Sequence, residues 1–263
     1  MFRLVSFFKY LLKSKGEQAI HSPFVFELYQ EVIRANTQFY CFASIEDLRQ
    51  VLKEDHTKIK VEDYGAGSGN AGHSEKTVAQ IAQKSIKSAA YAQLIFRLAC
   101  HREVKNVLEL GTSLGITTAY LAHAVNDGKV MSLEGSPDIL LRALAQSKKL
   151  NVDHKCEFIQ GPFQKTLSGA LQKGPFDLVF IDGHHVGDAM LNYLEMIKPN
   201  LTKDAVVIVD DIHWSADMQE AWNKVILDAD FSVSIDLFEM GLLFNGPETP
   251  KQHFVLRHLP SPF

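Results

Sequence analysis

The sequence has few cysteines, no long apolar stretch and no excess of basic residues, and each absence excludes a class of protein. The three cysteines, Cys41, Cys100 and Cys156, are odd in number, far apart and without C-x-x-C spacing. This pattern argues against a disulfide framework and a cysteine-rich zinc site, and it favours a reducing, cytoplasmic location. No stretch approaches the roughly 20 apolar residues that a membrane span needs, so no membrane span is expected.

The charge balance argues against a nucleic-acid partner. The chain has 27 basic and 31 acidic residues and a net charge of −4, so it lacks the excess of basic residues typical of proteins that bind nucleic-acid phosphates. A hydrophobic content of 46% in 263 residues is enough to form a sizeable core. This length fits one α/β domain with an appendage better than two full domains.

The first twelve residues, MFRLVSFFKYLL, are apolar enough to be compared with a signal peptide. Arg3 and Lys9 interrupt the apolar run, however, and no small-residue cleavage site follows it. The pattern predicts an amphipathic helix packed on the protein, with a helix lying on a membrane surface as the alternative.

Residues 1–88 are predicted to form helices and loops. A helix start is predicted at Ser22, the N-cap, with Pro23 at the first helical position. Ser44 with Asp47 forms a capping-box-like pattern that predicts a second helix, from Ser44 to Lys53. The glycines at 65, 67, 69 and 72 predict a loop.

From residue 89 onward, apolar runs alternate with helical patterns. Runs that are apolar on both faces indicate a parallel sheet covered by helices on both sides. Two β-like runs near the end, at 231–238 and 241–244, are too close together for a crossover helix and predict an antiparallel pair. The predicted strands before them are 106–110, 130–133, 157–159, 178–181 and 205–209, and the predicted helices are 90–100, 117–125, 139–150 and 189–197.

Two glycine-rich segments are candidates for a nucleotide-binding loop. The first, Asp63–Gly69, has more glycines, but no strand ending in an acidic residue follows it at the right distance. The second, Glu109–Gly115, follows an apolar strand and precedes a helix, and the next strand ends in Glu134. An acid in that place accepts hydrogen bonds from both ribose hydroxyls. We therefore expect the second segment to bind the nucleotide.

The spacing of the second segment favours one kind of cofactor. Gly111 and Gly115 follow G-x-x-x-G spacing, in contrast to the G-x-G-x-x-G of dinucleotide-binding loops. Glu109, two residues before Gly111, repels a pyrophosphate but attracts an ammonium group. S-adenosylmethionine (SAM) carries an ammonium, a ribose and no phosphate, so SAM is the expected cofactor.

Four motifs follow one another in the order Glu109–Gly115, Leu133–Pro137, Phe176–Asp182 and Val206–Asp211. Together they resemble class I SAM-dependent methyltransferases, in the O-methyltransferase branch that includes the catechol and caffeoyl-CoA enzymes. The resemblance covers about residues 89–244. It implies an α/β fold with a Rossmann-like, doubly wound, mostly parallel seven-stranded sheet and an antiparallel C-terminal strand. Residues 1–88 are then an N-terminal helical extension, and residues 89–263 are the SAM-binding domain.

The resemblance also implies which residues bind SAM. The loop at 160–163 lines the adenine in this family, so Phe163 is expected to pack on the ring, and Glu134 is expected to bind the ribose. The implied cofactor-binding residues are Glu109, Gly111, Thr112, Ser113, Gly115, Glu134, Gly161, Pro162, Phe163 and Asp182.

In the metal-dependent members of this branch, acids that end the fourth and fifth strands bind a divalent cation. The corresponding residues here are Asp182, Asp210 and Asp211, and three carboxylates suit a hard cation such as Mg²⁺ or Ca²⁺. His185 stands where the catechol-type enzymes place a lysine base, so His185 and Asp182 are the expected catalytic residues. His184 and His213 are alternative metal ligands.

These inferences predict a SAM-dependent O-methyltransferase that acts on a small-molecule hydroxyl. Two alternatives stay open, namely an NAD-dependent oxidoreductase of similar fold and a non-catalytic SAM-binding module. Members of the branch are often dimers, so the resemblance also implies a homodimer.

Overall fold

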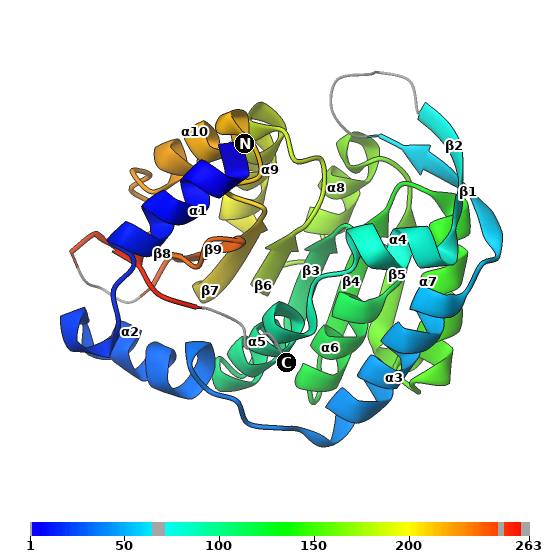
Figure 1. The fold of residues 1–263 in the computed structure, drawn as a ribbon, viewed down its shortest axis with the longest axis horizontal. Helices are drawn as coiled ribbons and strands as arrows, with labels where there is room; N and C mark the ends of the chain where they lie inside the picture. Colours follow the sequence, from blue (N-terminus) through cyan, green and yellow to red (C-terminus); the bar gives the residue numbers. More distant parts are fainter. Residues whose placement is uncertain (1, 65–71, 247–249, 259–263) are drawn as a thin grey trace. The chain divides into compact units, whose positions relative to one another are not determined.

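The computed structural model describes residues 2–64, 72–246 and 250–258 (Figure 1). The chain forms two compact units. We call residues 1–35 with 174–263 the terminal unit, and residues 36–173 the central unit. The N-terminal segment therefore groups with the C-terminal part of the chain.

The central unit is built on three parallel strands in the order β3-β4-β5. One helix crosses from β3 to β4 and another from β4 to β5. Both crossovers run in the same direction, so right-handed connections place the two helices on one face. The bounds are α5 Ala89–His101, β3 Asn106–Leu110, α6 Ile116–Ala124, β4 Lys129–Glu134, α7 Pro137–Lys149, β5 Cys156–Gln160 and α8 Phe163–Leu171, with a 3₁₀ turn at Asp153–Lys155.

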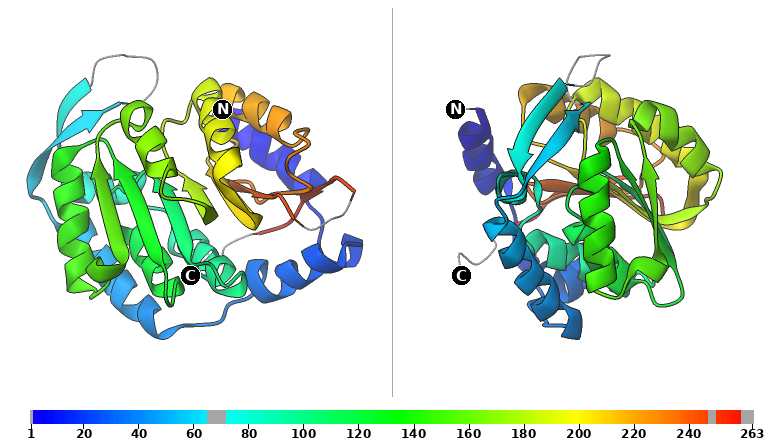
Figure 2. Two further views of the ribbon diagram at one scale, coloured as in Figure 1. Left: turned by 180° about the vertical axis from the view of Figure 1, so that it is seen from behind. Right: turned by 90° about the vertical axis from the view of Figure 1, so that its right-hand side faces the viewer.

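The part of the central unit before α5 holds a hairpin that the sequence analysis missed. Strands β1 (Lys58–Asp63) and β2 (Gly72–Thr77) pair in antiparallel register. The Lys60 N–H donates to Asp138 Oδ2 at 3.0 Å, which attaches β1 to the first turn of α7 (Figure 2). Most of the predicted glycine loop, from residue 65 to 71, lies outside the described residues, and Gly72 begins β2.

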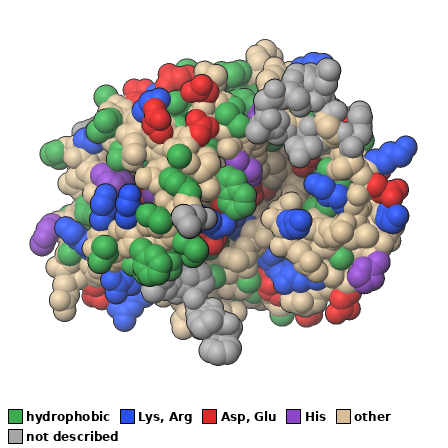
Figure 3. Space-filling view, turned by 45° about the horizontal axis from the view of Figure 1, so that its top comes forward, with side chains coloured by type: hydrophobic (Ala, Val, Ile, Leu, Met, Phe, Trp, Pro, Cys, Tyr) green, Lys and Arg blue, Asp and Glu red, His purple; other side chains and the backbone are tan. Residues whose placement is uncertain are grey.

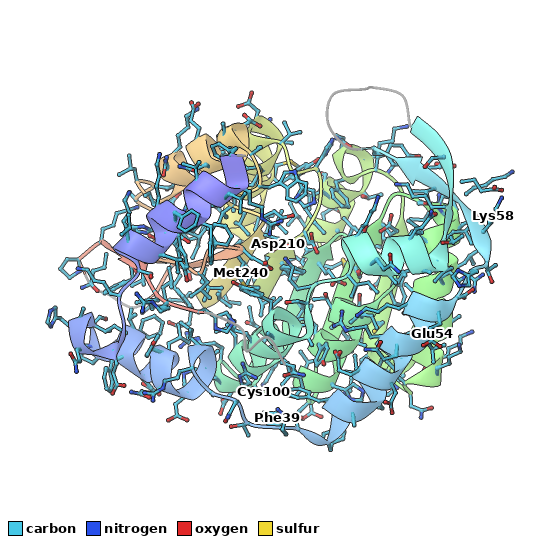
Figure 4. The ribbon with its side chains drawn as sticks, viewed as in Figure 1. Phe39, Glu54, Lys58, Cys100, Asp210 and Met240 are labelled. Atoms are coloured by element: carbon cyan, nitrogen blue, oxygen red, sulfur yellow. The ribbon has the colours of Figure 1, made fainter. Side chains whose placement is uncertain are left out.

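Helix α3 (Tyr40–Glu54) starts earlier than predicted. It follows Phe39, as the labelled residues in Figure 4 show, and not Ser44. The Ser44 hydroxyl instead donates to the Cys41 carbonyl at 3.0 Å within the helix, so its predicted role as N-cap is wrong. Helix α4 (Val78–Ser85) begins with a capping box between Thr77 and Gln80.

The terminal unit contributes five strands in the order β10-β8-β9-β7-β6. Strand β9 is antiparallel to both β7 and β8, so the predicted antiparallel pair is confirmed. Strand β10 adds a further edge strand beside β8, so that the described strands apart from the β1–β2 hairpin number eight, where seven were expected. The bounds are β6 Phe176–Ile181, α9 Gly187–Ile197, β7 Leu201–Asp210, α10 Ala216–Val225, β8 Val233–Asp236, β9 Met240–Phe244 and β10 Gln252–Val255, with a 3₁₀ turn at Lys198–Asn200.

The N-terminal segment of the terminal unit starts with α1 (Phe2–Lys13), which lies beside α10 (Figure 1). A 3₁₀ turn (Glu17–Ala19) precedes α2 (Pro23–Leu28), which continues into a π-helical turn (Tyr29–Ile33). Ser22 Oγ accepts a hydrogen bond from the Val25 N–H, so the predicted N-cap is confirmed. Within the described residues, no helix is both long and apolar enough to cross a membrane.

Candidate functional site

The loop between β3 and α6 has a backbone shape that favours glycine. Gly111 and Gly115 have φ angles of 106° and 81°, in the left-handed region. The N–H groups of Gly111 and Thr112 both donate to the Leu133 carbonyl, which fastens the loop to the end of β4. A Cβ at Gly115 would lie 3.1 Å from the Cβ of Ala143 on α7, so a side chain there would push the two helices apart.

Glu109 lies fully buried in the strand that leads to this loop. Its Oε2 accepts hydrogen bonds from the hydroxyls of Thr118 and Ser132, each at 2.5 Å, whereas its Oε1 has no partner among the described residues. Burial raises the pKa of Glu109 from 4.5 to about 7, although the two hydroxyls lower it. The carboxyl is therefore poised to change charge near neutral pH.

The sequence analysis missed the residues that hold Glu109 in place. Thr118 lies in the first turns of α6, and Ser132 lies in the middle of β4. The Thr112 hydroxyl extends the chain of hydrogen bonds, 2.6 Å from that of Ser132. A serine inside an otherwise apolar strand was the available signal, because a buried hydroxyl needs a hydrogen-bond partner.

Glu134 is the last residue of β4, and it forms hydrogen bonds to residues of three loops. Its Oε2 accepts from the Ser113 N–H at 3.0 Å, and its Oε1 accepts from the Ser136 N–H at 2.9 Å. The Glu134 carbonyl accepts from the Gly161 N–H at 2.8 Å. Burial raises the pKa of its carboxyl, and the backbone donors lower it. The Gly135 N–H is a third backbone donor to this carboxylate, whose two oxygens have about four lone-pair sites, so a further donor can still bind.

The segment after β5 forms the third of these loops. Gly161 has a φ angle of 133°, and Pro162 is the N-cap residue of α8. The Pro162 carbonyl accepts from the Thr166 hydroxyl at 3.1 Å, which fixes the start of the helix. Phe163 is the first residue of α8 and is half-buried. The predicted cofactor residues of the central unit thus lie in or next to the three loops that follow β3, β4 and β5, except Glu109, which lies inside β3.

In the terminal unit, the predicted acids and His185 gather after β6 and β7. Asp210 is buried at the end of β7, paired with Met240 of β9 (Figure 4). His185 Nδ1 lies 3.6 Å from Asp211 Oδ2, and its Nε2 lies 4.0 Å from Asp182 Oδ1. The imidazole therefore has a carboxylate near each ring nitrogen. Asp211 has a φ angle of 54°, in the left-handed region that aspartate tolerates better than most residues.

The other two histidines have separate partners. His184 Nδ1 lies 2.6 Å from the Tyr193 hydroxyl on α9. His213 Nε2 lies 2.8 Å from Asp236 Oδ2, and its ring stacks on Phe238. His185 lies beside two of the predicted strand-end acids, Asp182 and Asp211.

The donor chemistry of these acids suits a hard cation, but their arrangement does not form a metal-binding group. Among the residues with described positions, no three His, Cys, Asp or Glu side chains come together closely enough to hold a metal ion. A site at Asp182, Asp210 and Asp211 would need these side chains to move. The cation stays a prediction, and no step of the chemistry below depends on it.

The comparisons with known proteins point to one class. Residues 108–212 match a family described as a methyltransferase domain. Several solved structures share the fold. An O-methyltransferase of tomaymycin synthesis from Streptomyces achromogenes, in complex with SAM, covers 80% of this chain and 92% of its own, with 18% identity and a TM-score of 0.56. An O-methyltransferase from Bacillus cereus, in complex with S-adenosylhomocysteine (SAH), covers 80% and 93%, with 16% identity and a TM-score of 0.57.

The relatives that match in sequence include catechol and caffeoyl-CoA O-methyltransferases. A catechol O-methyltransferase of Mycobacterium tuberculosis is 32% identical over 126 residues, 48% of this chain and 56% of that protein. A caffeoyl-CoA O-methyltransferase of Medicago sativa is 27% identical over 133 residues, 49% of this chain and 53% of that protein. The chain thus spans little more than half the length of these relatives. The resemblance to class I SAM-dependent methyltransferases of the O-methyltransferase branch is confirmed.

Proposed function

We propose that this protein is a SAM-dependent O-methyltransferase that acts on a small-molecule hydroxyl group. The observation that carries the proposal is the way Glu134 is held, by the backbone of the loop containing Gly111 and Gly115 and by its own loop. This arrangement leaves the carboxylate able to accept a further hydrogen bond, as from a ribose hydroxyl. The relatives named above, which are O-methyltransferases, support the choice of reaction. An NAD-dependent oxidoreductase has less support, because the segment between β3 and α6 has G-x-x-x-G spacing. The G-x-G-x-x-G spacing of residues 67–72 leads into strand β2, whereas a dinucleotide-binding loop leads into a helix.

In the proposed cofactor site, Phe163 provides an apolar wall for the adenine, while Gly161 and Pro162 shape the turn before it. Thr112, Ser113 and Gly115 contribute the backbone of the first loop. Glu109 is buried and acts on the ammonium group through its negative charge. SAM supplies a methyl group bonded to a positively charged sulfur. Asp182 is the proposed cofactor residue of the terminal unit.

In the proposed reaction, His185 removes the proton of the acceptor hydroxyl as the oxygen bonds to the methyl carbon. The sulfur keeps the electron pair of the broken S–C bond, so the second product is neutral at sulfur. Asp182 and Asp211 lie 4.0 Å and 3.6 Å from His185 and stabilise the imidazolium that forms. Holding the two reactants in line contributes about 7–11 kcal/mol, and a positioned base adds roughly 10²–10⁴ in rate.

Replacing Glu134 with Gln tests the cofactor assignment. The amide keeps the shape of the side chain but loses the charge and one acceptor, so SAM affinity is expected to fall about 10- to 100-fold. Calorimetry with SAM measures the dissociation constant. The matched control is Glu157→Gln on the neighbouring strand β5, where the carboxylate pairs with Lys173 at the surface. Failure of the wild type to bind SAM, or equal affinity in all three proteins, would remove the assignment.

A divalent cation at Asp182, Asp210 and Asp211 makes a separate prediction. A bound ion stabilises the folded state by mass action, so Mg²⁺ or Ca²⁺ is expected to raise the melting temperature of the wild type. The Asp211→Asn variant is expected to lose most of that increase. If neither the added ions nor a chelator changes the melting temperature or the rate of methyl transfer, the metal is excluded.

Three broader assignments belong to the same proposal. Residues 89–263 are the SAM-binding domain, and residues 1–88 are an extension that helps to select the acceptor. This extension contributes to both compact units, residues 1–35 to one and 36–88 to the other. The protein is cytoplasmic and forms a homodimer, as members of the branch often do.

A further inference from the structure

Helix α1 exposes most of its large apolar residues, whereas Phe7 packs against Phe238 with the ring centroids 4.9 Å apart. The side packed on the terminal unit also carries the buried residues Ser6 and Tyr10. The outward side carries four large apolar residues, of which Leu12 is 88% exposed, namely Leu4, Val5, Phe8 and Leu12. An ordinary surface helix has the opposite arrangement, with its apolar stripe facing the core.

Specific polar contacts fix this orientation. The Ser6 hydroxyl donates to Gln219 Oε1 on α10 at 3.0 Å, and the Tyr10 hydroxyl donates to the Leu256 carbonyl at 2.6 Å. Arg3 pairs with Glu239 at 3.4 Å. These contacts cannot form if the helix rotates to bury its apolar side. The outward stripe is therefore a fixed feature of the folded unit.

The stripe is continuous along the helix. Leu4, Phe8 and Leu12 are spaced by four residues, so they lie in one row along the helix axis. Val5 lies next to this row. A contiguous exposed apolar surface of this kind marks an interaction site.

The charge of α1 indicates what the stripe contacts. The helix FRLVSFFKYLLK contains three basic residues and no acidic residue. Lys9 and Lys13 are exposed, and each directly follows a residue of the apolar row. Figure 3 shows hydrophobic, basic and acidic side chains together on the face of the molecule that it presents. A short helix with Phe and Leu on one side and lysines beside them is typical of a segment that lies in an anionic lipid surface.

A second copy of the chain fits this surface less well. In a symmetric dimer the same face meets itself. Lys9 and Lys13 of both copies would then lie in or beside one interface, and like charges brought together there oppose association. An anionic lipid surface attracts the same lysines.

We propose that α1 binds anionic membrane surfaces, with Leu4, Phe8 and Leu12 inserted among the lipid headgroups. The protein then acts at a membrane without spanning it. This proposal does not depend on methyl transfer.

Sedimentation of the full chain with lipid vesicles tests the proposal. The wild type is expected to bind vesicles of phosphatidylcholine with phosphatidylglycerol, to bind far less to phosphatidylcholine alone, and to dissociate at high salt. The Phe8→Ser/Leu12→Gln variant is expected to bind at least about tenfold more weakly, because it loses two inserting side chains. Lys9→Gln/Lys13→Gln is expected to lose the preference for anionic lipid.

A matched control uses two exposed leucines elsewhere in the chain. The Leu141→Gln/Leu227→Gln variant removes residues that are 64% and 78% exposed and is expected to bind as the wild type does. Absence of wild-type binding, or equal binding to neutral and anionic vesicles, would overturn the proposal. So would a wild-type dimer, seen by light scattering, that the Phe8→Ser/Leu12→Gln variant abolishes.

Discussion

Replacing Glu109 with Gln is expected to remove a pH dependence of folding stability worth about 2.5 kcal/mol between pH 5 and pH 8. In the folded protein, burial raises the pKa of Glu109 from 4.5 to about 7. The protonated form is therefore favoured by folding. Its contribution to stability is fully present below pH 4.5 and is lost as the pH rises through about 7. Glutamine does not titrate, so the variant lacks this contribution.

Urea denaturation at several pH values between 5 and 8 measures the effect. The amide of the variant leaves an unpaired donor near the position of Oε1, which lowers stability by about 1–3 kcal/mol at every pH. The informative quantity is therefore the difference in slope with pH, not the absolute stability. Glu220→Gln, at an exposed carboxylate on α10, is the control and is expected to keep the wild-type slope. Equal slopes in the wild type and Glu109→Gln would show that the Glu109 carboxyl titrates normally.

Urea denaturation at several pH values also tests whether the Glu109 carboxylate lies near the ammonium group of bound SAM. A cation near the carboxylate favours its charged form and lowers its pKa. The wild type saturated with SAM is therefore expected to show a smaller loss of stability between pH 5 and pH 8 than the free protein. An unchanged loss in the presence of bound SAM would separate Glu109 from the cofactor.

Replacing His185 with Asn is expected to lower the turnover number roughly 10²- to 10⁴-fold while leaving SAM affinity nearly unchanged. Asparagine cannot take up the proton of the acceptor hydroxyl. SAH formation with a panel of catechols and other small hydroxyl compounds measures turnover, and calorimetry measures SAM binding. A variant with wild-type turnover would exclude His185 as the base.

His184→Asn is the matched control, because it makes the same substitution at the adjacent residue. The His184 side chain contacts the Tyr193 hydroxyl, so this variant is expected to lose about 1 kcal/mol of stability and little turnover. Asparagine also tolerates the φ angle of 68° at this position. If both variants lose turnover equally, the loss comes from a structural change that they share, and His185 is not shown to act as the base.

The parallel part of the fold was predictable because burial on both faces leaves a strong pattern. The predicted strand 106–110 has the same bounds as β3, and β4 extends the predicted 130–133 by one residue at each end. Helix α8 and the β1–β2 hairpin were missed for related reasons. Gly169 and polar residues interrupt the short apolar stripe of α8, and charged side chains on the exposed face of the hairpin obscure its alternation.

The sequence predicted which loops form the candidate site, but it did not predict the contacts between their residues. Within the terminal unit, the ends of the parallel strands β6 and β7 place Asp182 and Asp210 at the same edge, and within the central unit the end of β4 places Glu134. Only the resemblance separated His185 from His184 as the expected base, because the two adjacent residues have the same chemistry. It also gave no indication that the Ser113 N–H reaches Glu134, since that contact depends on the backbone of a turn.

The hydrogen bond from Tyr10 to the Leu256 carbonyl joins residues 246 positions apart. During synthesis, α1 emerges from the ribosome long before Leu256 does. The helix therefore lacks part of its docking surface until the chain has been made as far as Leu256. Contacts of such long sequence separation form late in folding and are sensitive to chain length. A truncation that ends before Leu256 would remove the acceptor of the Tyr10 hydroxyl and weaken the docking of α1, although every residue of α1 would still be present.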